Sequence, residues 1–510
     1  MTRRESKPTA SASSRPAPRF FSSYLWNSAA KLGDFGLAYV FAVVLARMLA
    51  PAEYGAYASV LSLATLVFVL SSMGIDKTLH RFLGEYAATP ESHRASTLIR
   101  MLFGVRVALI IILVGAVVLG RNWIALRYEN AAIAPLILAG ALYMVCQSLA
   151  SFASNALVGL LRTRSVGILT LLFRSTNIIA ALVILNRGAG VREIMVMLGI
   201  TGTLLLFGYL WSIGRFLGER GGAVEFRPVL AFATSAWVLT AVGFGLGKQS
   251  DVIILNAIRH GQAEVAFYDV AFSLTHAVGT ALTVGLSGIA LALFSRRQTR
   301  RPDAIGTLWT SVIALTGTVV TPLVVFLMGN AAACVITIYG REYAEAGGLL
   351  LAYALPMTIN WVLGGGASST ALQATHRIGK VLRVRMITGA LNVLLNIVLV
   401  SRWGAAGALA GTGACAMSAV LAELIMARRA LGITLPLRHV PYVVGAALVA
   451  LIPSAIWRPS GFGPLALHGI VFAGIYAGLL LLARPLPRLD DGLVEALPGR
   501  LRTLVVRVTR

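Results

Sequence analysis

Long apolar runs separated by short polar joints dominate the pattern of this chain. A run of about 20 apolar residues is long enough to cross a hydrocarbon core of roughly 30 Å as a helix. Fourteen such runs are expected as membrane spans, at residues 24–46, 56–75, 98–119, 132–158, 165–185, 194–214, 231–256, 267–293, 305–328, 347–370, 382–400, 404–427, 440–457 and 465–483. The pattern therefore predicts an all-α polytopic membrane protein with about 14 transmembrane helices.

The stretch from Trp26 to Leu63 is restated near the middle of the chain. Its motif AEYGAY, residues 52–57, aligns with AEVAFY, residues 263–268, at an offset of 211, and the same offset places Trp26 on Trp237. A repeat of this length indicates two similar halves, an arrangement from which many transporters are built. Each half holds six spans, an even number, so both copies enter the membrane from the same side and the repeats are parallel.

The two halves and the remaining segments divide the chain into five parts. The N-terminal tail is rich in Ser, Pro and Arg and is expected to be disordered, because it cannot bury apolar surface. The last two spans fall outside the repeat. The predicted parts are a disordered cytoplasmic tail at 1–23, an N-lobe at 24–217, a C-lobe at 218–430, the two extra spans at 431–483, and a cytoplasmic tail at 484–510 with an interfacial helix at 489–508.

Composition also places the chain in a membrane, with 57% hydrophobic and only 13% charged residues. The net charge of +24 would suggest a nucleic-acid partner for a soluble protein, but here the basic residues mark topology. Of the 44 Lys and Arg residues, 31 fall in segments on one side of the membrane and 9 in loops on the other. The positive-inside rule therefore predicts that both termini are cytoplasmic, and nucleic acid is not an expected partner.

The cysteines and the first apolar run exclude two further features. Cys146, Cys334 and Cys415 lie within or beside apolar spans without a spaced pair, which argues against a disulfide or a metal site. The first apolar run is too long for a cleaved signal peptide, and it carries Lys31 and Asp34. We expect neither a metal nor a cofactor.

Lys31 and Asp34 lie inside the first span and are the first candidates for function. With Asn27 they occupy positions i, i+4 and i+7, which share one helix face. A charge at mid-bilayer costs about 2.5–3.5 kcal/mol on insertion scales, so this stripe is expected to face protein or water. Two interpretations stay open: a functional site in which Lys31 binds substrate and Asp34 couples an ion, or an internal Lys–Asp pair that joins helices.

Three further charged positions lie in or beside spans. Arg106, in the third span, is either a cavity residue or an interfacial side chain that reaches back to the headgroups. Arg174 lies near the middle of the fifth span with no acidic residue within one turn, so its counter-charge is expected on another helix or on a ligand. Glu423, at the inner end of the twelfth span, is expected to pair with Arg428 or Arg429.

The seventh span carries a second Lys-x-x-Asp pair, Lys248 and Asp251. This pair lies six residues further along the repeat than Lys31 and Asp34, about 9 Å of helix rise, so the two pairs are expected at different depths. Asp251 is expected either to neutralise Lys248 or to couple an ion, and Lys248 is a candidate for substrate binding.

Three stretches of the chain resemble a known family. They are LARMLAPAEYGAYASVLSL and the residues that follow it to Tyr86, KQSDVIILNAIRHGQAEVAFYDVAFSL at 248–274, and ALQATHRIGKVLRVRMITGALNVLLNIVLVSRWGAAGALAGTGACAMSAVLAELI at 371–425. In these stretches the chain is similar to Wzx-type polysaccharide flippases of the multidrug/oligosaccharidyl-lipid/polysaccharide exporter superfamily. The resemblance covers most of residues 20–430.

The resemblance implies two six-helix lobes that face each other in a V around a central cavity, with pseudo-twofold symmetry and two extra helices. It also implies transport of an undecaprenyl-pyrophosphate-linked oligosaccharide from the cytoplasmic to the periplasmic leaflet of the bacterial inner membrane. The partners it implies are that lipid-linked substrate, membrane lipids and polysaccharide polymerase machinery. No enzymatic activity is expected.

Two alternatives stay open. A multidrug and toxin extrusion antiporter would share the fold but carry a cation, whereas Lys31, Arg106, Arg174 and Lys248 outnumber the two aspartates of the spans by two. That balance favours a pyrophosphate, and the four cations are the predicted substrate-binding residues. A membrane glycosyltransferase or polymerase would need catalytic groups on sizeable loops, and the outer loops are short.

Overall fold

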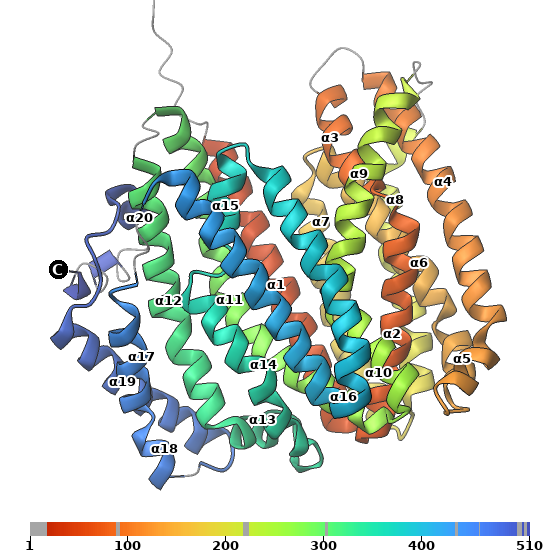
Figure 1. Ribbon diagram of the computed structural model, residues 1–510. Helices are drawn as coiled ribbons and strands as arrows, with labels where there is room; N and C mark the ends of the chain where they lie inside the picture. The colour runs from red at the N-terminus through yellow and green to blue at the C-terminus, as the bar shows by residue number, and fades with distance from the viewer. Residues whose placement is uncertain are drawn as a thin grey trace, which may run out of the picture.

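The computed structural model describes residues 18–87, 92–217, 224–300, 304–433, 437–457, 459–496, 502–503 and 507–509. Within these ranges the regular elements are helices, apart from an isolated bridge between Leu486 and Thr509. Most of the predicted N-terminal tail, residues 1–17, lies outside the described residues, whereas residues 18–23 belong to the first helix. Figure 1 shows two helical bundles, with further helices along the outer side of one of them.

The first bundle contains six long helices that coincide with the first six predicted spans. They are α1 (Pro18–Met48), α2 (Pro51–Ser72), α4 (Ser92–Leu119), α6 (Ile133–Gly159), α7 (Thr163–Asn186) and α8 (Val191–Leu217). Two shorter helices, α3 (Ile75–Ala87) and α5 (Arg121–Arg127), were not predicted. The helix α1 packs along α7, and α6 packs against α2, α4 and α8.

The tight turn between α1 and α2 follows from the residues that begin α2. Pro51 occupies the first helical turn, where its missing N–H breaks no intrahelical hydrogen bond. The Glu53 carboxylate accepts the Ala50 N–H at 3.3 Å, which closes a capping interaction. At the other end of α2 the backbone passes through positive φ at Met73 and at Gly74, so the helix stops there.

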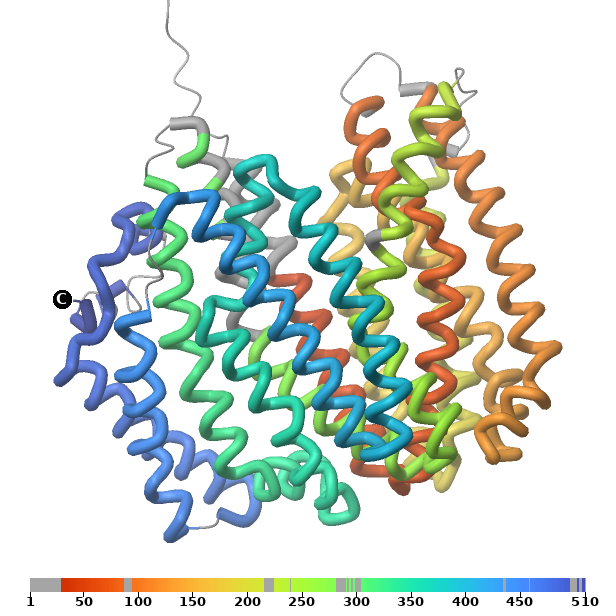
Figure 2. The backbone as a smooth tube through the Cα atoms, in the orientation of Figure 1, coloured from red at the N-terminus to blue at the C-terminus, as the bar shows by residue number. Residues whose placement is uncertain are grey.

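The second bundle contains more interruptions than the first, as the tube in Figure 2 shows. Its helices are α9 (Phe226–Gly245), α10 (Lys248–Arg259), α11 (Gln262–Arg300), α12 (Ile305–Gly329), α13 (Ala331–Tyr339), α14 (Glu345–Val362), α15 (Ala367–Ala374) and α16 (Ile378–Leu431), with a 3₁₀ turn at Arg341–Tyr343. The seventh predicted span is divided between α9 and α10. The tenth is divided between α14 and α15, which are bent by 45° relative to each other.

The helix α16 joins predicted spans eleven and twelve at a sharp corner. Gly404 has non-helical torsions, φ 55° and ψ −133°, so α16 is two helices that meet at a kink. A Cβ atom at Gly404 would lie 1.9 Å from Glu264 Oε1, and the same oxygen accepts the Ala405 N–H at 2.8 Å. Glycine is required here because a side chain disfavours positive φ and because the start of α11 lies against the corner.

Ten helices among the described residues are long and apolar enough to cross a membrane, and eleven if the bent pair α14 and α15 forms one span. Each of the fourteen predicted spans coincides with one of these, with one arm of α16, with α11, or with the short apolar pair α17 (Val440–Ala450) and α18 (Ile452–Ile456). The last span is α19 (Phe462–Ala483). The predicted fold class, an all-α polytopic membrane protein, is therefore confirmed.

The C-terminal segment packs on the second bundle. Within the predicted interfacial helix 489–508, the structure has one short named helix, α20 (Asp491–Ala496). Asp490 accepts two hydrogen bonds from Arg297 of α11, at 3.0 and 2.9 Å, and Leu493 is buried in the apolar cluster around α12. This part of the tail is therefore attached to protein, whereas residues 497–501 and 504–506 of the predicted interfacial helix lie outside the described residues.

The two bundles contact each other most closely where α2 meets α10 and α11. A Cβ atom at Gly55 of α2 would lie 1.7 Å from the carbonyl oxygen of Gln262, so the two backbones touch there. The largest buried apolar cluster contains residues of both bundles, among them Tyr54 and Val265. This end of the molecule, which carries the α1–α2 and α10–α11 turns and is the lower end in Figure 1, is called the closed end below.

Candidate functional site

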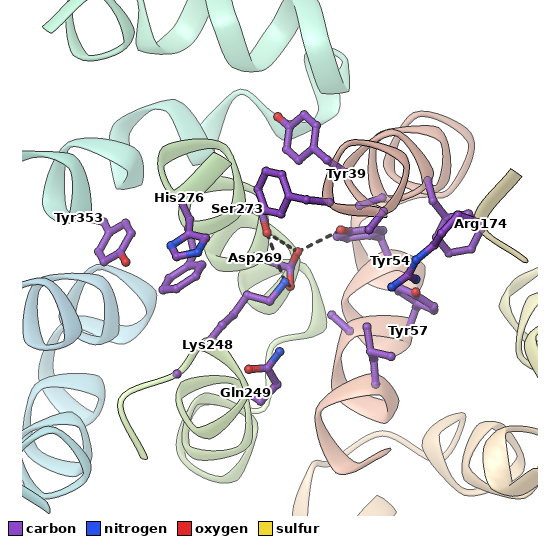
Figure 3. A pocket seen from close by; sticks show the side chains of 18 of the residues that line it. Tyr39, Tyr54, Tyr57, Arg174, Lys248, Gln249, Asp269, Ser273, His276 and Tyr353 are labelled. Carbon is purple, nitrogen blue, oxygen red and sulfur yellow. Dashed lines mark hydrogen bonds and ion pairs between the residues drawn. The ribbon is translucent and has the colours of Figure 1, made fainter. Parts of the chain in front are cut away.

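A cavity of about 610 Å³ lies between the two bundles. Its lining comes from α1, α2, α6, α7 and α8 of the first bundle and from α10, α11, α14 and α16 of the second. The charged residues in the lining are Arg174, Lys248, Asp269 and Arg385. Figure 3 shows Arg174 and the Lys248–Asp269 pair on opposite sides of this space.

Arg174 lies on the α7 wall and is held by Asp34 of α1. Its Nε donates a hydrogen bond to Asp34 Oδ1 at 2.7 Å. Among the described residues, no acceptor lies within hydrogen-bond distance of its two terminal nitrogens. The counter-charge that the sequence predicted on another helix or on a ligand is therefore on α1, and the guanidinium keeps free donors on the cavity wall.

A second cavity, of about 270 Å³, lies inside the first bundle beside Arg174. Lys31, Asp34 and Arg174 line it, together with the hydroxyl groups of Ser151, Ser154, Thr163, Thr170 and Tyr209. Arg174 lines both cavities, so the Arg174–Asp34 pair lies where they meet. The alternative of a Lys31–Asp34 pair is corrected, because Asp34 pairs with Arg174.

Lys248 pairs with Asp269 of α11, so of the two interpretations of Asp251 the one in which it neutralises Lys248 is wrong. Lys248 Nζ lies 2.8 Å from Asp269 Oδ1 and donates to Ser273 Oγ at 3.2 Å. Tyr54 of the first bundle donates to Asp269 Oδ2 at 3.0 Å, so this carboxylate contacts both bundles. The helix α10 begins at Lys248, after the break that follows α9. Its first turn contacts α11 through Lys248, and both α11 and α16 through Asp251.

Asp251 is fully buried and does not line either cavity. Its carboxylate accepts hydrogen bonds from Tyr268 Oη at 2.7 Å, from Asn396 Nδ2 at 2.7 Å and from Thr412 Oγ1. The Oδ1 atom of Asn396 has no hydrogen-bond partner. The donors around this carboxylate are all neutral, and no described residue forms an ion pair with it.

In the part of the chain that the structure describes, no group of three or more His, Cys, Asp or Glu side chains could hold a metal ion. Cys146, Cys334 and Cys415 are buried and free.

Arg385 lines the central cavity, although the sequence analysis did not single it out. Its Nε and one terminal nitrogen donate to the two oxygens of Glu423, at 2.6 and 3.1 Å. The predicted pairing of Glu423 with Arg428 or Arg429 is therefore wrong. The two arms of α16 run side by side, which brings together residues that lie 38 positions apart.

Arg106 lies behind the wall of the first bundle and lines neither cavity. Its side chain is fully buried, with a terminal nitrogen that donates to Ser148 O at 3.3 Å and a guanidinium 5.3 Å from the centre of the Phe68 ring. Its Nε and other terminal nitrogen have no hydrogen-bond partner. The structure therefore separates Arg106 from the other three predicted cations.

Aromatic side chains form much of the remaining wall. They are Tyr39, Tyr54, Tyr57, Tyr143 and Phe173 from the first bundle and Phe272, His276 and Tyr353 from the second. His276 stacks on Phe272 with 5.5 Å between ring centres, and Phe272 stacks on Tyr353 at 4.7 Å. The sequence analysis missed this wall and Asp269. The available signal was the spacing of Asp269, Ser273 and His276, which share one face of α11.

Hydrogen bonds between neutral side chains join the bundles at the closed end. Ser59 donates to Gln262 Oε1 at 2.9 Å, and Asn256 Nδ2 donates to Ser59 Oγ at 2.9 Å. Within the second bundle, Gln262 Nε2 donates to Asn256 Oδ1 at 2.7 Å, which links these two bonds. Tyr339 of α13 donates to the hydroxyl of Tyr39 of α1 at 3.0 Å. Such bonds each contribute about 0.5–1.5 kcal/mol, so their loss on separation of the bundles costs little.

Two similar bundles of membrane helices enclose a charged cavity, the architecture that transporters built from two repeats share. The chain belongs to the polysaccharide biosynthesis protein family, whose family model matches residues 44–347. Its resemblance to Wzx-type flippases of the multidrug/oligosaccharidyl-lipid/polysaccharide exporter superfamily is thereby confirmed. No curated protein matches the chain in sequence.

Solved structures match the fold over most of the chain. The lipid II flippase MurJ in an inward closed conformation is similar at a TM-score of 0.74 and 13% identity, covering 90% of this chain and 98% of that one. A multidrug resistance MATE family transporter in an inward-facing conformation is similar at 0.63 and 13% identity, covering 80% and 94%. A third transporter of the superfamily, from Pyrococcus furiosus, is similar at 0.55 and 14%, covering 80% and 95%. At these identities the likeness shows the fold alone.

The contact between Tyr54 and Asp269 yields a test of the closed end. Tyr54→Phe removes the hydroxyl that joins α2 to the carboxylate of α11. A hydrogen bond to a charged group contributes about 1.5–3 kcal/mol, so the population with separated bundles is expected to rise about tenfold or more. Electron spin resonance distances between labels at Ala52 and Ala344, both exposed at this end, measure that population in a cysteine-free protein.

Tyr57→Phe is the matched control, because Tyr57 lies one turn further along α2 and its hydroxyl has no hydrogen-bond partner among the described residues. Distance distributions that are identical for Tyr54→Phe, Tyr57→Phe and the unmodified protein would show that the Tyr54–Asp269 contact does not hold the closed end.

Proposed function

We propose that this protein flips an undecaprenyl-pyrophosphate-linked oligosaccharide from the cytoplasmic to the periplasmic leaflet by alternating access. The observation that carries the proposal is Arg174. Its guanidinium is held inside the membrane by one bond to Asp34, while its terminal nitrogens remain free at the wall of a 610 Å³ cavity between the bundles. An arginine so placed suits the bidentate binding of a phosphate group.

The charges around the cavity support an anionic substrate over the organic cation of a multidrug antiporter. Arg174, Lys248 and Arg385 line the cavity, against Asp269 alone. The carboxylates that hold the two arginines lie behind the wall, since Asp34 lines the smaller cavity and Glu423 is fully buried. An anion entering from the cavity therefore meets the cations first.

The aromatic wall supports a sugar as the second part of the substrate. Rings such as His276 and Tyr353 present flat apolar faces with polar tips, a combination that suits the alternating C–H and hydroxyl surface of a saccharide. A phosphate at Arg174 and a saccharide against α11 and α14 would together fill the space between the bundles. Polymerase machinery as a partner stays a prediction of the family resemblance.

Orientation is a further part of the proposal, with both termini in the cytoplasm of a bacterial cell and the closed end at the periplasmic face of the inner membrane. The support is the excess of basic residues on the opposite side, as the positive-inside rule requires. A single cysteine at Arg192 is expected to react with an impermeant thiol reagent added to intact cells, and one at Lys380 to be protected, since both positions are exposed. The reverse labelling pattern would overturn the orientation.

Ion coupling is proposed at Asp251 in preference to Asp34. Asp34 is already neutralised by Arg174, whereas Asp251 forms no ion pair with any described residue. Asp251→Asn keeps the size of the side chain but removes the charge that would bind a cation or a proton. In proteoliposomes, transport by the unmodified protein is expected to rise when an ion or pH gradient is imposed, and transport by Asp251→Asn is expected not to respond. An equal response in both would exclude Asp251 from coupling.

The central test concerns Arg174. Arg174→Ala is expected to abolish flipping of the lipid-linked oligosaccharide, Arg174→Lys to restore part of it, and Lys31→Ala to give a milder loss, because an ammonium cannot reproduce the two-pronged contact of a guanidinium. The measurement is transport in proteoliposomes with equal amounts of folded protein. Asp34→Asn combined with Arg174→Ala controls for the carboxylate left unpaired by the single change. Transport at the unmodified rate by Arg174→Ala would refute the cationic-site model.

A further inference from the structure

The internal repeat extends from the opening hairpin into the cavity itself. At the offset of 211, five pairs of equivalent positions have both members in the lining of the central cavity. The pairs are Phe35 with Leu246, Ala38 with Gln249, Ala58 with Asp269, Leu61 with Phe272, and Arg174 with Arg385. One unbroken offset from α1 to α7 therefore matches positions on α10, α11 and α16, and the cavity is bounded by corresponding faces of the two bundles.

Four of these five pairs combine different residue types, and only the fifth is identical. The substitutions change an alanine to an aspartate in one pair and to a glutamine in another, so the two faces have diverged in charge and polarity. Arg174 and Arg385 are the exception among the lining pairs. Both place a guanidinium at the wall of the cavity between the bundles.

Each of the two arginines is held in the same manner, by a carboxylate on a neighbouring helix of its own bundle. Asp34 of α1 accepts one bond from Arg174, and Glu423 of the second arm of α16 accepts two bonds from Arg385. The carboxylates do not occupy equivalent positions, since the offset places Asp34 on Gly245 and Glu423 on Ser212. The arginines thus correspond in the two bundles while their supports do not.

Arg385 keeps one terminal nitrogen without an acceptor among the described residues, and its side chain is 35% exposed, while Glu423 is fully buried behind it. The guanidinium therefore presents a free edge to the cavity, as Arg174 does from the other bundle. A diphosphate carries two anionic groups, and one guanidinium on each wall is a matched set of donors for them.

We infer that Arg385 is a second substrate-binding residue, and that the diphosphate of the substrate is bound by Arg174 and Arg385 from the two bundles together. This inference rests on the proposed function and adds a residue that the sequence analysis did not include. It explains why positions 174 and 385 both carry arginine, although the other four pairs of equivalent positions in the cavity carry different residue types. It also makes the substrate a bridge between the bundles, so that its binding affects their separation.

The rival explanation is that Arg385 only clamps the two arms of α16 through Glu423. In that case the single change Arg385→Ala harms the protein because it leaves a buried carboxylate unpaired. Replacing both members, Arg385→Ala with Glu423→Gln, removes that penalty and separates the two explanations. The matched control is Arg297→Ala with Asp490→Asn. Arg297 of α11 and Asp490 are likewise joined by two hydrogen bonds, and neither residue lines a cavity.

The experiment measures binding of undecaprenyl diphosphate and of undecaprenyl monophosphate to the purified full-length protein. For the Arg385→Ala/Glu423→Gln protein, the Kd of the diphosphate is expected to rise about tenfold or more, since a charge-assisted contact is lost. The Kd of the monophosphate is expected to change less than threefold or so, because Arg174 alone binds one phosphate. The Kd of the diphosphate for Arg385→Lys is expected to lie between the values for the unmodified protein and the Arg385→Ala/Glu423→Gln protein. The Arg297→Ala/Asp490→Asn control is expected to have the Kd of the unmodified protein.

Unchanged diphosphate binding in the Arg385→Ala/Glu423→Gln protein, together with weakened binding in Arg174→Ala, would refute the role of Arg385 and leave the proposed function standing. Equal losses for diphosphate and monophosphate would also refute it, because a bridge between two phosphates requires the difference. Failure of the unmodified protein to bind either lipid would refute the proposed function itself.

Discussion

A charged side chain inside a bilayer needs a partner or water, and the internal ion pairs of this protein satisfy that need within each bundle. Arg174 pairs with Asp34, Lys248 with Asp269, and Arg385 with Glu423. An unpaired charge at the membrane centre costs about 2.5–3.5 kcal/mol, so each pair fixes the approach of the two helices that carry it. The helices of one bundle are thereby tied to each other by contacts that separation of the bundles leaves intact.

The contacts between the bundles are of a different kind. At the closed end they include the backbone approach at Gly55, neutral hydrogen bonds such as that from Asn256 to Ser59, and two bonds that involve charged groups. Tyr54 donates to Asp269, and Arg47 of α1 donates to the Ile338 carbonyl of α13 at 2.7 Å. A neutral hydrogen bond contributes only about 0.5–1.5 kcal/mol net, and its partners find water when the surfaces separate. Ion pairs thus hold helices together within each bundle, whereas hydrogen bonds and apolar packing join the bundles at the closed end, an arrangement that suits rigid-body movement of one bundle against the other.

The positions of the ion pairs also determine which charged groups line the cavity. Asp34 does not line the central cavity, Glu423 is fully buried, and Asp269 is nearly covered by Lys248, Ser273 and Tyr54. Basic groups are thus stabilised inside the membrane while part of each remains available at the wall. Around them the tyrosines, Phe272 and His276 supply apolar surface with hydroxyl and imidazole groups, the environment expected for a substrate with a charged head and a sugar.

Local pattern was sufficient for the spans, the two halves and the presence of charge inside the membrane, because apolar length and a repeat offset are properties of the chain itself. Arg174 was recognisable for the same reason, since no acidic residue lies near it in sequence.

The partners of the charged residues were not predictable in this way. Lys248 and Asp251 lie three residues apart, yet Lys248 pairs with Asp269 of α11, whereas Asp251 accepts hydrogen bonds from neutral side chains of α11 and α16. Glu423 lies near two arginines in sequence but bonds to Arg385, because the corner at Gly404 lays the arms of α16 together. Which charge meets which, and therefore which cations line the cavity, depends on contacts between distant helices that only the tertiary structure brings about.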